Sequence, residues 1–250
     1  MVIYEYGDVR HPAVLLIHGM AMDVRKSFGR TIDLLKNDYH VMAAAMDGYD
    51  EQRTQFSSIA LEAEKIAQYL RQGGYDHLYA IIGMSMGGFT SLDLVCRHGI
   101  RADRLVLDSG YLNNYPLPRL FAKAVTWGYQ MTMQEKAMPL VRFLSKLLMG
   151  YGYTRKQLYE NASAKTIENN EYACLTYQLP ENLEEALKDT EVRFWYGKKE
   201  HSMIRGMQTL KARLPEMKEV CMGNYGHGQL MTEHPDKYAR RVMHVLSEKQ

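Results

Sequence analysis

Short apolar runs along the chain alternate with longer stretches in which apolar residues recur at helical spacing. Ala13–Ile17, Val41–Met46, Leu78–Ile82 and Leu105–Asp108 are the clearest of these runs, and their length and apolar character predict buried strands. Between them, stretches such as 57–72 place an apolar residue at every third or fourth position, which predicts helices. Strands that alternate with helices are typical of an α/β fold with a mainly parallel sheet.

This alternation stops after Leu105–Asp108 and resumes near Val192. Residues 111–187 contain several helical stretches and no convincing strand. The sequence therefore predicts a core formed by residues 1–110 and 188–250, with a helical cap inserted at 111–187. Further strands are expected at 192–197 and 218–222, and a last helix at about 235–247.

The strand predicted at Leu78–Ile82 leads directly into Gly83-Met84-Ser85-Met86-Gly87. A strand that ends in G-x-S-x-G and opens a helix is the nucleophile elbow of serine hydrolases. The serine must lie on a tight, strained turn, and glycines two residues to either side avoid a collision within that turn. Ser85 is therefore the candidate nucleophile.

A serine hydroxyl needs a base, and the base needs an acid that orients it. In the strand–turn–helix arrangement the chain order is Ser, then Asp or Glu, then His. Glu200 follows the strand predicted at 192–197, and His227 stands between two glycines just after the last predicted strand. We therefore expect Ser85, Glu200 and His227 to be the catalytic residues.

Two alternatives to this assignment remain open at the level of sequence. Asp108 also ends a predicted strand, so it competes with Glu200 for the role of acid. His201 is the rival of His227 as the base, because it is adjacent to Glu200.

An oxyanion hole completes such a site. One donor is expected to be the backbone N–H of Met86, the residue after the candidate nucleophile. The loop Ile17-His18-Gly19-Met20 follows an earlier predicted strand, and the N–H of Met20 is the expected second donor. His18 is expected to hold this loop through hydrogen bonds.

Taken together, these residues resemble the α/β-hydrolase family, in particular its single-domain members with a helical cap. The resemblance extends from about Ala13 to the last helix, apart from the cap. It implies an eight-stranded, mostly parallel sheet flanked by helices, with the site at the carboxyl edge of the strands, under the cap. The chain departs from the family pattern in two respects. The acid is Glu200, where aspartate is commoner, and only one short candidate strand, at 2–6, precedes Ala13.

The sequence predicts a serine hydrolase that cleaves a carboxylic ester or a related acyl bond through an acyl-enzyme intermediate. A thioesterase, a lysophospholipase or monoglyceride lipase, and a carbon–carbon bond hydrolase would use the same residues. Ser85 excludes the enzymes that use an aspartate nucleophile, such as epoxide and haloalkane hydrolases. A protein that binds a small ligand with little turnover is the alternative from another class. The aromatic- and methionine-rich cap predicts a moderately apolar acyl substrate, and neither a metal nor an organic cofactor is implied.

Charge, hydropathy and cysteine content bear on the partners and the location of the protein. The formal net charge is only +2 with the two signs interspersed, which argues against a dedicated nucleic-acid surface. No stretch approaches the ~18 apolar residues of a membrane-spanning helix, and residues 1–6 lack the features of a signal peptide. Three widely separated cysteines without metal-ligand spacing predict reduced thiols and a cytoplasmic protein. The oligomeric state cannot be predicted from these features.

Overall fold

The computed structural model describes residues 1–52, 54–134 and 138–248. In this part of the chain, seven strands form one sheet in the order β1-β3-β2-β4-β5-β6-β7. Only β1 runs antiparallel to its neighbour, β3, and the remaining pairs are parallel. The strands are β1 (Val2–Tyr6), β2 (Ala13–Ile17), β3 (His40–Ala45), β4 (His77–Met84), β5 (Arg101–Asp108), β6 (Glu191–Tyr196) and β7 (Lys218–Cys221).

The sequence-based prediction of an α/β fold with a mostly parallel central sheet flanked by helices is confirmed. The family resemblance implies eight strands, and the described residues contain seven. The reason is visible at the start of the chain, where β1 alone precedes β2. This strand pairs with β3 along its whole length, from Val2 opposite Ala45 to Tyr6 opposite Val41, and so forms the edge of the sheet.

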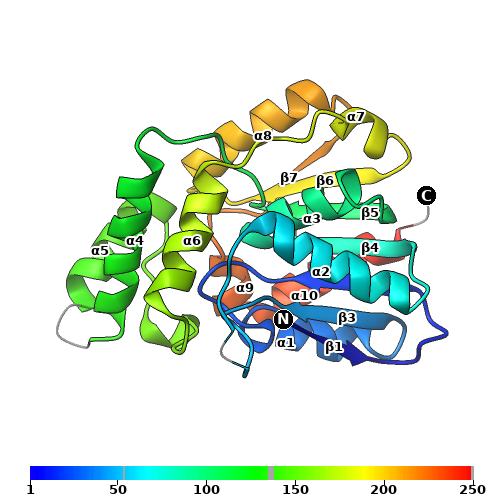
Figure 1. Ribbon diagram of the computed structural model, residues 1–250, viewed down its shortest axis with the longest axis horizontal. Coiled ribbons are helices and arrows are strands. Elements are labelled where there is room, and N and C mark those ends of the chain that lie inside the picture. Colours follow the sequence, from blue (N-terminus) through cyan, green and yellow to red (C-terminus); the bar gives the residue numbers. More distant parts are fainter. Residues whose placement is uncertain (53, 135–137, 249–250) are drawn as a thin grey trace.

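Helices cover both faces of the sheet because side chains alternate in direction along each strand. In β2, Val14 and Leu16 pack in one core with α1 and α10, whereas Leu15 and Ile17 pack in a second core with α2 and α3. Figure 1 shows α2 and α3 in front of the sheet and α1 and α10 behind it. The helices of the two layers are α1 (Val24–Leu35), α2 (Ile59–Gln72), α3 (Met86–Cys96), α8 (His201–Arg213), α9 (Gln229–Glu233) and α10 (Pro235–Ser247).

Two of these helices begin where the sequence supplies a capping side chain. Asp23 accepts a hydrogen bond from the Lys26 N–H at 2.7 Å and caps α1. Ser58 does the same for α2, with the N–H of Leu61 at 3.2 Å. Such caps satisfy N–H groups that the first helical turn leaves without partners.

The chain between β5 and β6 is helical in all its regular elements among the described residues. Its helices are α4 (Pro118–Thr132), α5 (Met138–Met149), the short 3-10 helix η2 (Arg155–Gln157), α6 (Ala164–Leu175) and α7 (Leu183–Ala186). Helix α4 packs against both α5 and α6, and Figure 1 shows these three helices together at one end of the sheet. That residues 111–187 act as a cap over a substrate stays a prediction. None of the helices in the described ranges combines the length and apolar character needed to cross a bilayer.

Candidate active site

Ser85 lies on a strained turn between β4 and α3. Its φ of 51° and ψ of −119° fall where residues other than glycine are rarely found. The turn is closed by backbone contacts that leave no room for side chains. A Cβ at Gly83 would lie 2.4 Å from the carbonyl oxygen of Gly87, and one at Gly87 would lie 2.1 Å from the carbonyl oxygen of Ile17. The two glycines of the motif are therefore required by packing as well as by the turn.

A continuous chain of hydrogen bonds joins Ser85, His227 and Glu200. The Nε2 atom of His227 lies 2.8 Å from the Ser85 hydroxyl oxygen, and its Nδ1 lies 2.8 Å from Oε1 of Glu200. A carboxylate only accepts hydrogen bonds, so Nδ1 carries the proton and Nε2 is free to accept one from the serine. The second oxygen of Glu200 accepts a hydrogen bond from the N–H of Gly197, which fixes the carboxylate.

The three side chains come from separate turns of the core. Ser85 directly precedes α3, Glu200 directly precedes α8, and His227 stands two residues before α9. Glu200 and His227 are both buried, with about 5% of each residue exposed. His201, the rival base, is exposed on the first turn of α8, and the structure gives its side chain no contact with Ser85.

The backbone of His227 is held by the last residue of α5 and by the segment that follows this helix. Its N–H donates to the carbonyl oxygen of Met149 at 2.9 Å, and its carbonyl oxygen accepts from the Tyr153 hydroxyl at 2.5 Å. Sequence analysis did not identify Tyr153, because a tyrosine in an aromatic-rich helical segment carries no signal of its own. The position of the histidine thus depends on residues inserted between β5 and β6.

Three carboxyl groups raise the pKa of His227. Burial alone would lower the pKa of His227, but the hydrogen bond and charge of Glu200, with the charges of Asp108 and Glu171, raise it above the ordinary value. Burial raises the pKa of Asp108 to about 7, and the nearby Glu200 charge adds to this effect. Burial also raises the pKa of Glu171, on α6, to about 7. Glu171 is a second residue at this site that no sequence pattern singled out.

Asp108, the alternative acid, lies beside Glu200 rather than in its place. Both carboxyl groups line a small internal cavity together with Tyr238. In the described part of the chain, Nδ1 of His227 bonds to Glu200, and no hydrogen bond joins it to Asp108. The backbone of Asp108 has a separate role, since its carbonyl oxygen accepts from the N–H of Ser85 at 2.8 Å.

The loop after β2 lies against the serine. A Cβ on Gly19 would come within 3.0 Å of the Cβ of Ser85, so the backbone that leads into Met20 passes directly beside the hydroxyl-bearing residue. Met86 occupies the first position of α3, where a helix leaves N–H groups without an intrahelical acceptor. The residue before Met20 and the first residue of α3, Met86, thus both lie next to Ser85, as the two candidate oxyanion donors require.

His18 fixes this loop from the inside of the protein. It is fully buried, and burial lowers its pKa to about 4, so the imidazole is neutral at neutral pH. Its Nε2 accepts from the Met46 N–H at 3.1 Å, which leaves the proton on Nδ1 to be donated to the carbonyl oxygen of Gly19 at 2.8 Å. The imidazole thus joins the loop after β2 to the end of β3.

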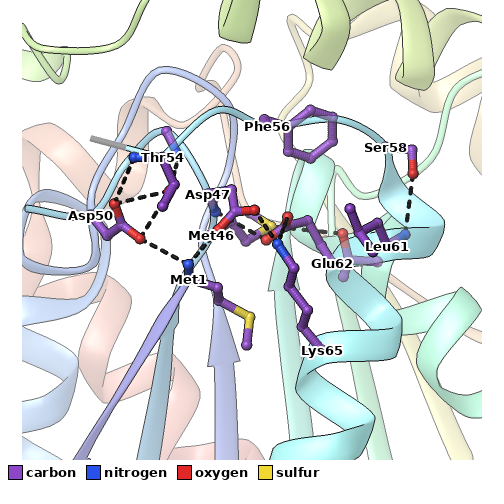
Figure 2. A network of polar contacts seen from close by, with 12 residues as sticks. Met1, Met46, Asp47, Asp50, Thr54, Phe56, Ser58, Leu61, Glu62 and Lys65 are labelled. Atoms are coloured by element: carbon purple, nitrogen blue, oxygen red, sulfur yellow. Dashed lines mark hydrogen bonds and ion pairs between the residues drawn. The ribbon is translucent and has the colours of Figure 1, made fainter. Parts of the chain in front are cut away.

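A network of charged groups continues from Met46 into the loop before α2 (Figure 2). The Asp47 N–H donates to Oε2 of Glu62 at 3.0 Å, and the Asp47 carboxylate pairs with Lys65. The Met1 amino group contacts Asp47 and lies 2.9 Å from Asp50. Glu62 is fully buried, and its Oε1 has no hydrogen-bond partner among the described residues.

This burial makes Glu62 a source of pH-dependent stability. Burial raises the pKa of Glu62 from 4.5 to about 7, so between these values the folded protein binds more protons than the unfolded chain. The free energy of unfolding therefore falls as the pH rises from about 4.5 to about 7. We expect Glu62→Gln to stabilise the protein by about 1–3 kcal/mol at pH 8 and to give little gain at pH 4.5. Urea unfolding at the two pH values measures the difference.

Glu64→Gln is the matched control, because Glu64 lies on the same helix and is exposed. It should change the free energy of unfolding by less than about 0.5 kcal/mol at either pH. A stability change from Glu62→Gln that is the same at both pH values would contradict the assignment of Glu62.

Comparisons with known proteins agree with this fold. The sequence profile of the alpha/beta hydrolase fold matches residues 12–214, and no curated protein sequence is similar enough to count as a match. A protein from Desulfitobacterium hafniense, described as belonging to the alpha/beta hydrolase family, is 21% identical with a TM-score of 0.79, covering 98% of this chain and 100% of that one. A carboxylesterase structure from Nitrososphaera gargenis is 16% identical with a TM-score of 0.76, covering 98% and 93% of the two chains. The esterase EaEST from Exiguobacterium antarcticum is 15% identical with a TM-score of 0.74, covering 98% and 95%.

Proposed function

Since the chain belongs to the α/β hydrolase fold family, we propose that it is a serine hydrolase that cleaves a carboxylic ester or a related acyl bond. The observation that carries this proposal is the unbroken hydrogen-bond chain from Ser85 through His227 to Glu200. A protein that only binds a ligand has no need of an aligned nucleophile, base and acid. The esterases among the structural neighbours have the same fold.

In the proposed mechanism, His227 Nε2 removes the proton from the Ser85 hydroxyl as its oxygen attacks the carbonyl carbon. The imidazolium that forms is stabilised by Glu200 and passes its proton to the leaving alcohol oxygen when the ester bond breaks. Water then attacks the acyl-enzyme while His227 takes a proton from it. His227 returns this proton to the Ser85 oxygen as the acyl bond breaks, which releases the acid and restores the serine hydroxyl. The N–H groups of Met20 and Met86 stabilise the negative charge on the carbonyl oxygen in both steps.

The acid in this proposal is Glu200, because its carboxylate lies 2.8 Å from the imidazole nitrogen that must be held. A raised pKa of about 7 makes Asp108 the poorer candidate, since the acid has to carry a negative charge to stabilise an imidazolium.

The proposed substrate is a small molecule with a moderately apolar acyl or alcohol group. The esterase assignment is preferred among acyl hydrolases because esterases occur among the neighbours that share this fold. Thioesters, monoacylglycerols and carbon–carbon bonds next to a carbonyl would engage the same three residues. Rates of cleavage measured with a panel of these substrates identify the bond that the protein cleaves.

Intact mass after treatment with a fluorophosphonate tests the proposal. The wild-type protein should gain the mass of one phosphonyl group, because an activated serine next to an oxyanion hole attacks phosphorus as it attacks a carbonyl carbon. Ser85→Ala should gain none, whereas Ser57→Ala, which changes an exposed serine, should be labelled like the wild type. Absence of label on folded wild-type protein would reject the proposed nucleophile and favour ligand binding without turnover.

A further inference from the structure

Large apolar side chains are exposed together on α4 and α5. Seven of the eight exposed large hydrophobic residues in the described part of the chain belong to these helices or to the residue before α4. Leu117 and Leu147 are each 72% exposed, a level at which a leucine has almost no protein neighbours. We call this group the hairpin face; its members are Leu117, Leu120 and Trp127 at α4, and Leu140, Phe143, Leu147 and Leu148 on α5.

The sides of α4 and α5 that form the hairpin face are distinct from the sides that pack against the rest of the protein. Helix α4 already buries a separate side, including Ala122, Thr126 and Tyr129, and α5 buries Val141. On α5 the exposed residues Leu140, Phe143 and Leu147 follow one another by three and four positions, which places them on one side of the helix. Both helices are thus apolar on two sides, and Figure 1 shows them together at one end of the molecule, beside α6. Clusters of exposed large apolar side chains mark interaction surfaces.

Basic residues predominate around the hairpin face. Residues 117–157 contain seven basic residues and one acidic residue, Glu135, although the whole chain carries a net charge of only +2. Six of the basic residues lie in the described part of this range. Lys123 on α4, and Arg142 and Lys146 on α5, are exposed. None of these three has an ion-pair partner in the described ranges. The others of these six are Arg119, which lies over the Tyr172 ring, Arg155, which pairs with Glu160, and Lys156.

The combination of apolar and basic groups indicates which kind of partner binds to the hairpin face. A second copy of the chain, docked through the same face about a twofold axis, would bring the group formed by Lys123, Arg142 and Lys146 to the same interface as the identical group of the other copy. Like charges would then oppose the apolar contact. A membrane surface that contains anionic lipids satisfies both groups, because leucine, phenylalanine and tryptophan enter the headgroup–acyl boundary while lysine and arginine meet the phosphates.

We propose that the hairpin face docks on the surface of a membrane that contains anionic lipids. The proposal does not depend on the proposed catalytic function, since it rests on exposure and charge alone. It has a consequence for the site, because Met149, the last residue of α5, accepts the hydrogen bond from the His227 N–H. The docked helix and the base of the site are therefore in direct contact.

Vesicle co-sedimentation tests the proposal, with Ser85→Ala protein so that no lipid is hydrolysed during the experiment. Vesicles of phosphatidylcholine with phosphatidylglycerol should bind the protein at least about tenfold more tightly than vesicles of phosphatidylcholine alone. Adding Phe143→Ser and Leu147→Ser should lower binding to the anionic vesicles by about tenfold or more. Lys123→Glu with Lys146→Glu should lower it by a similar factor, and added salt should weaken the wild-type interaction.

Two control variants change similar side chains elsewhere. Val9→Ser alters the one large hydrophobic residue that is exposed outside the hairpin face in the described ranges, and Arg240→Glu reverses an exposed charge on α10. Both should bind like the parent protein, and melting temperatures of all variants should agree within a few degrees. Equal affinity for the two kinds of vesicle, or full binding by the Phe143→Ser, Leu147→Ser variant, would overturn the proposal. So would light scattering that shows a dimer which these two substitutions dissociate, because a second copy would then cover the face.

Discussion

Replacing His227 with Asn is expected to lower kcat/KM for an ester substrate by a factor of about 10³–10⁶. Among the residues that the structure describes, the base within hydrogen-bond distance of the Ser85 hydroxyl is the His227 Nε2 atom, at 2.8 Å. Without it the proton of the serine has no acceptor, and the leaving group has no donor. Initial rates with short-chain p-nitrophenyl esters, together with the rate of fluorophosphonate labelling, measure the loss.

His201→Asn is the control for this experiment, because it removes an imidazole next to Glu200 that is exposed. Its kcat/KM is expected to stay within about twofold of the wild type, in keeping with the small effects of surface substitutions. If His201→Asn were the more damaging change, His201 would be the base, and the assignment of His227 would be wrong.

Replacing Glu200 with Gln is expected to lower kcat by about 10³–10⁴, the loss known for a serine protease in which an amide replaces the triad carboxylate. An amide can present its N–H₂ group to His227 Nδ1, which favours the imidazole tautomer with the proton on Nε2. That tautomer cannot accept the serine proton. Asp108→Asn leaves the bond between His227 and Glu200 intact, so its kcat is expected to fall by less than about tenfold.

The pH dependence separates the two carboxyl groups further. The activity needs neutral His227, so kcat/KM should rise with pH through the pKa of the imidazole. Glu200 is the main group that raises this pKa against the effect of burial, and Glu200→Gln should therefore shift the midpoint of the rise to lower pH. A larger loss of kcat in Asp108→Asn than in Glu200→Gln would identify Asp108 as the acid.

Much of the core could be predicted because its local signals agree with one another. The strand before Ser85, the paired glycines and the following helix all require the same turn, and the structure has that turn with φ of 51° at Ser85. The N-terminal strand, the parallel strands and the last helix were also predicted within a few residues of their observed bounds. Helix α9 was not, because a helix of five residues is too short to show a period.

Contacts between segments that are distant in the sequence could not be predicted from local sequence patterns. Both Glu200 and Asp108 follow predicted strands, and only the three-dimensional arrangement shows which carboxylate reaches the imidazole. Tyr153 contacts the carbonyl of His227 through a fold of the inserted segment that no local pattern encodes. The apolar residues of α4 and α5 predict helices, yet their spacing does not distinguish a side that packs inward from one that faces outward.

The residues of the candidate site are held by two parts of the protein that differ in stability. Ser85 is seated on the sheet, where the backbone approaches so closely that a Cβ on Gly88 would come within 2.3 Å of the Cα of Gly110. His227 is steadied by Met149 and Tyr153, from a segment whose neighbouring helices expose much of their apolar surface. Cooperative units with fewer buried contacts open at lower free energy than the core. Gentle heating should therefore separate the base from the nucleophile while the sheet stays folded, so that catalytic power is the first property the protein loses on heating and the last it regains on cooling.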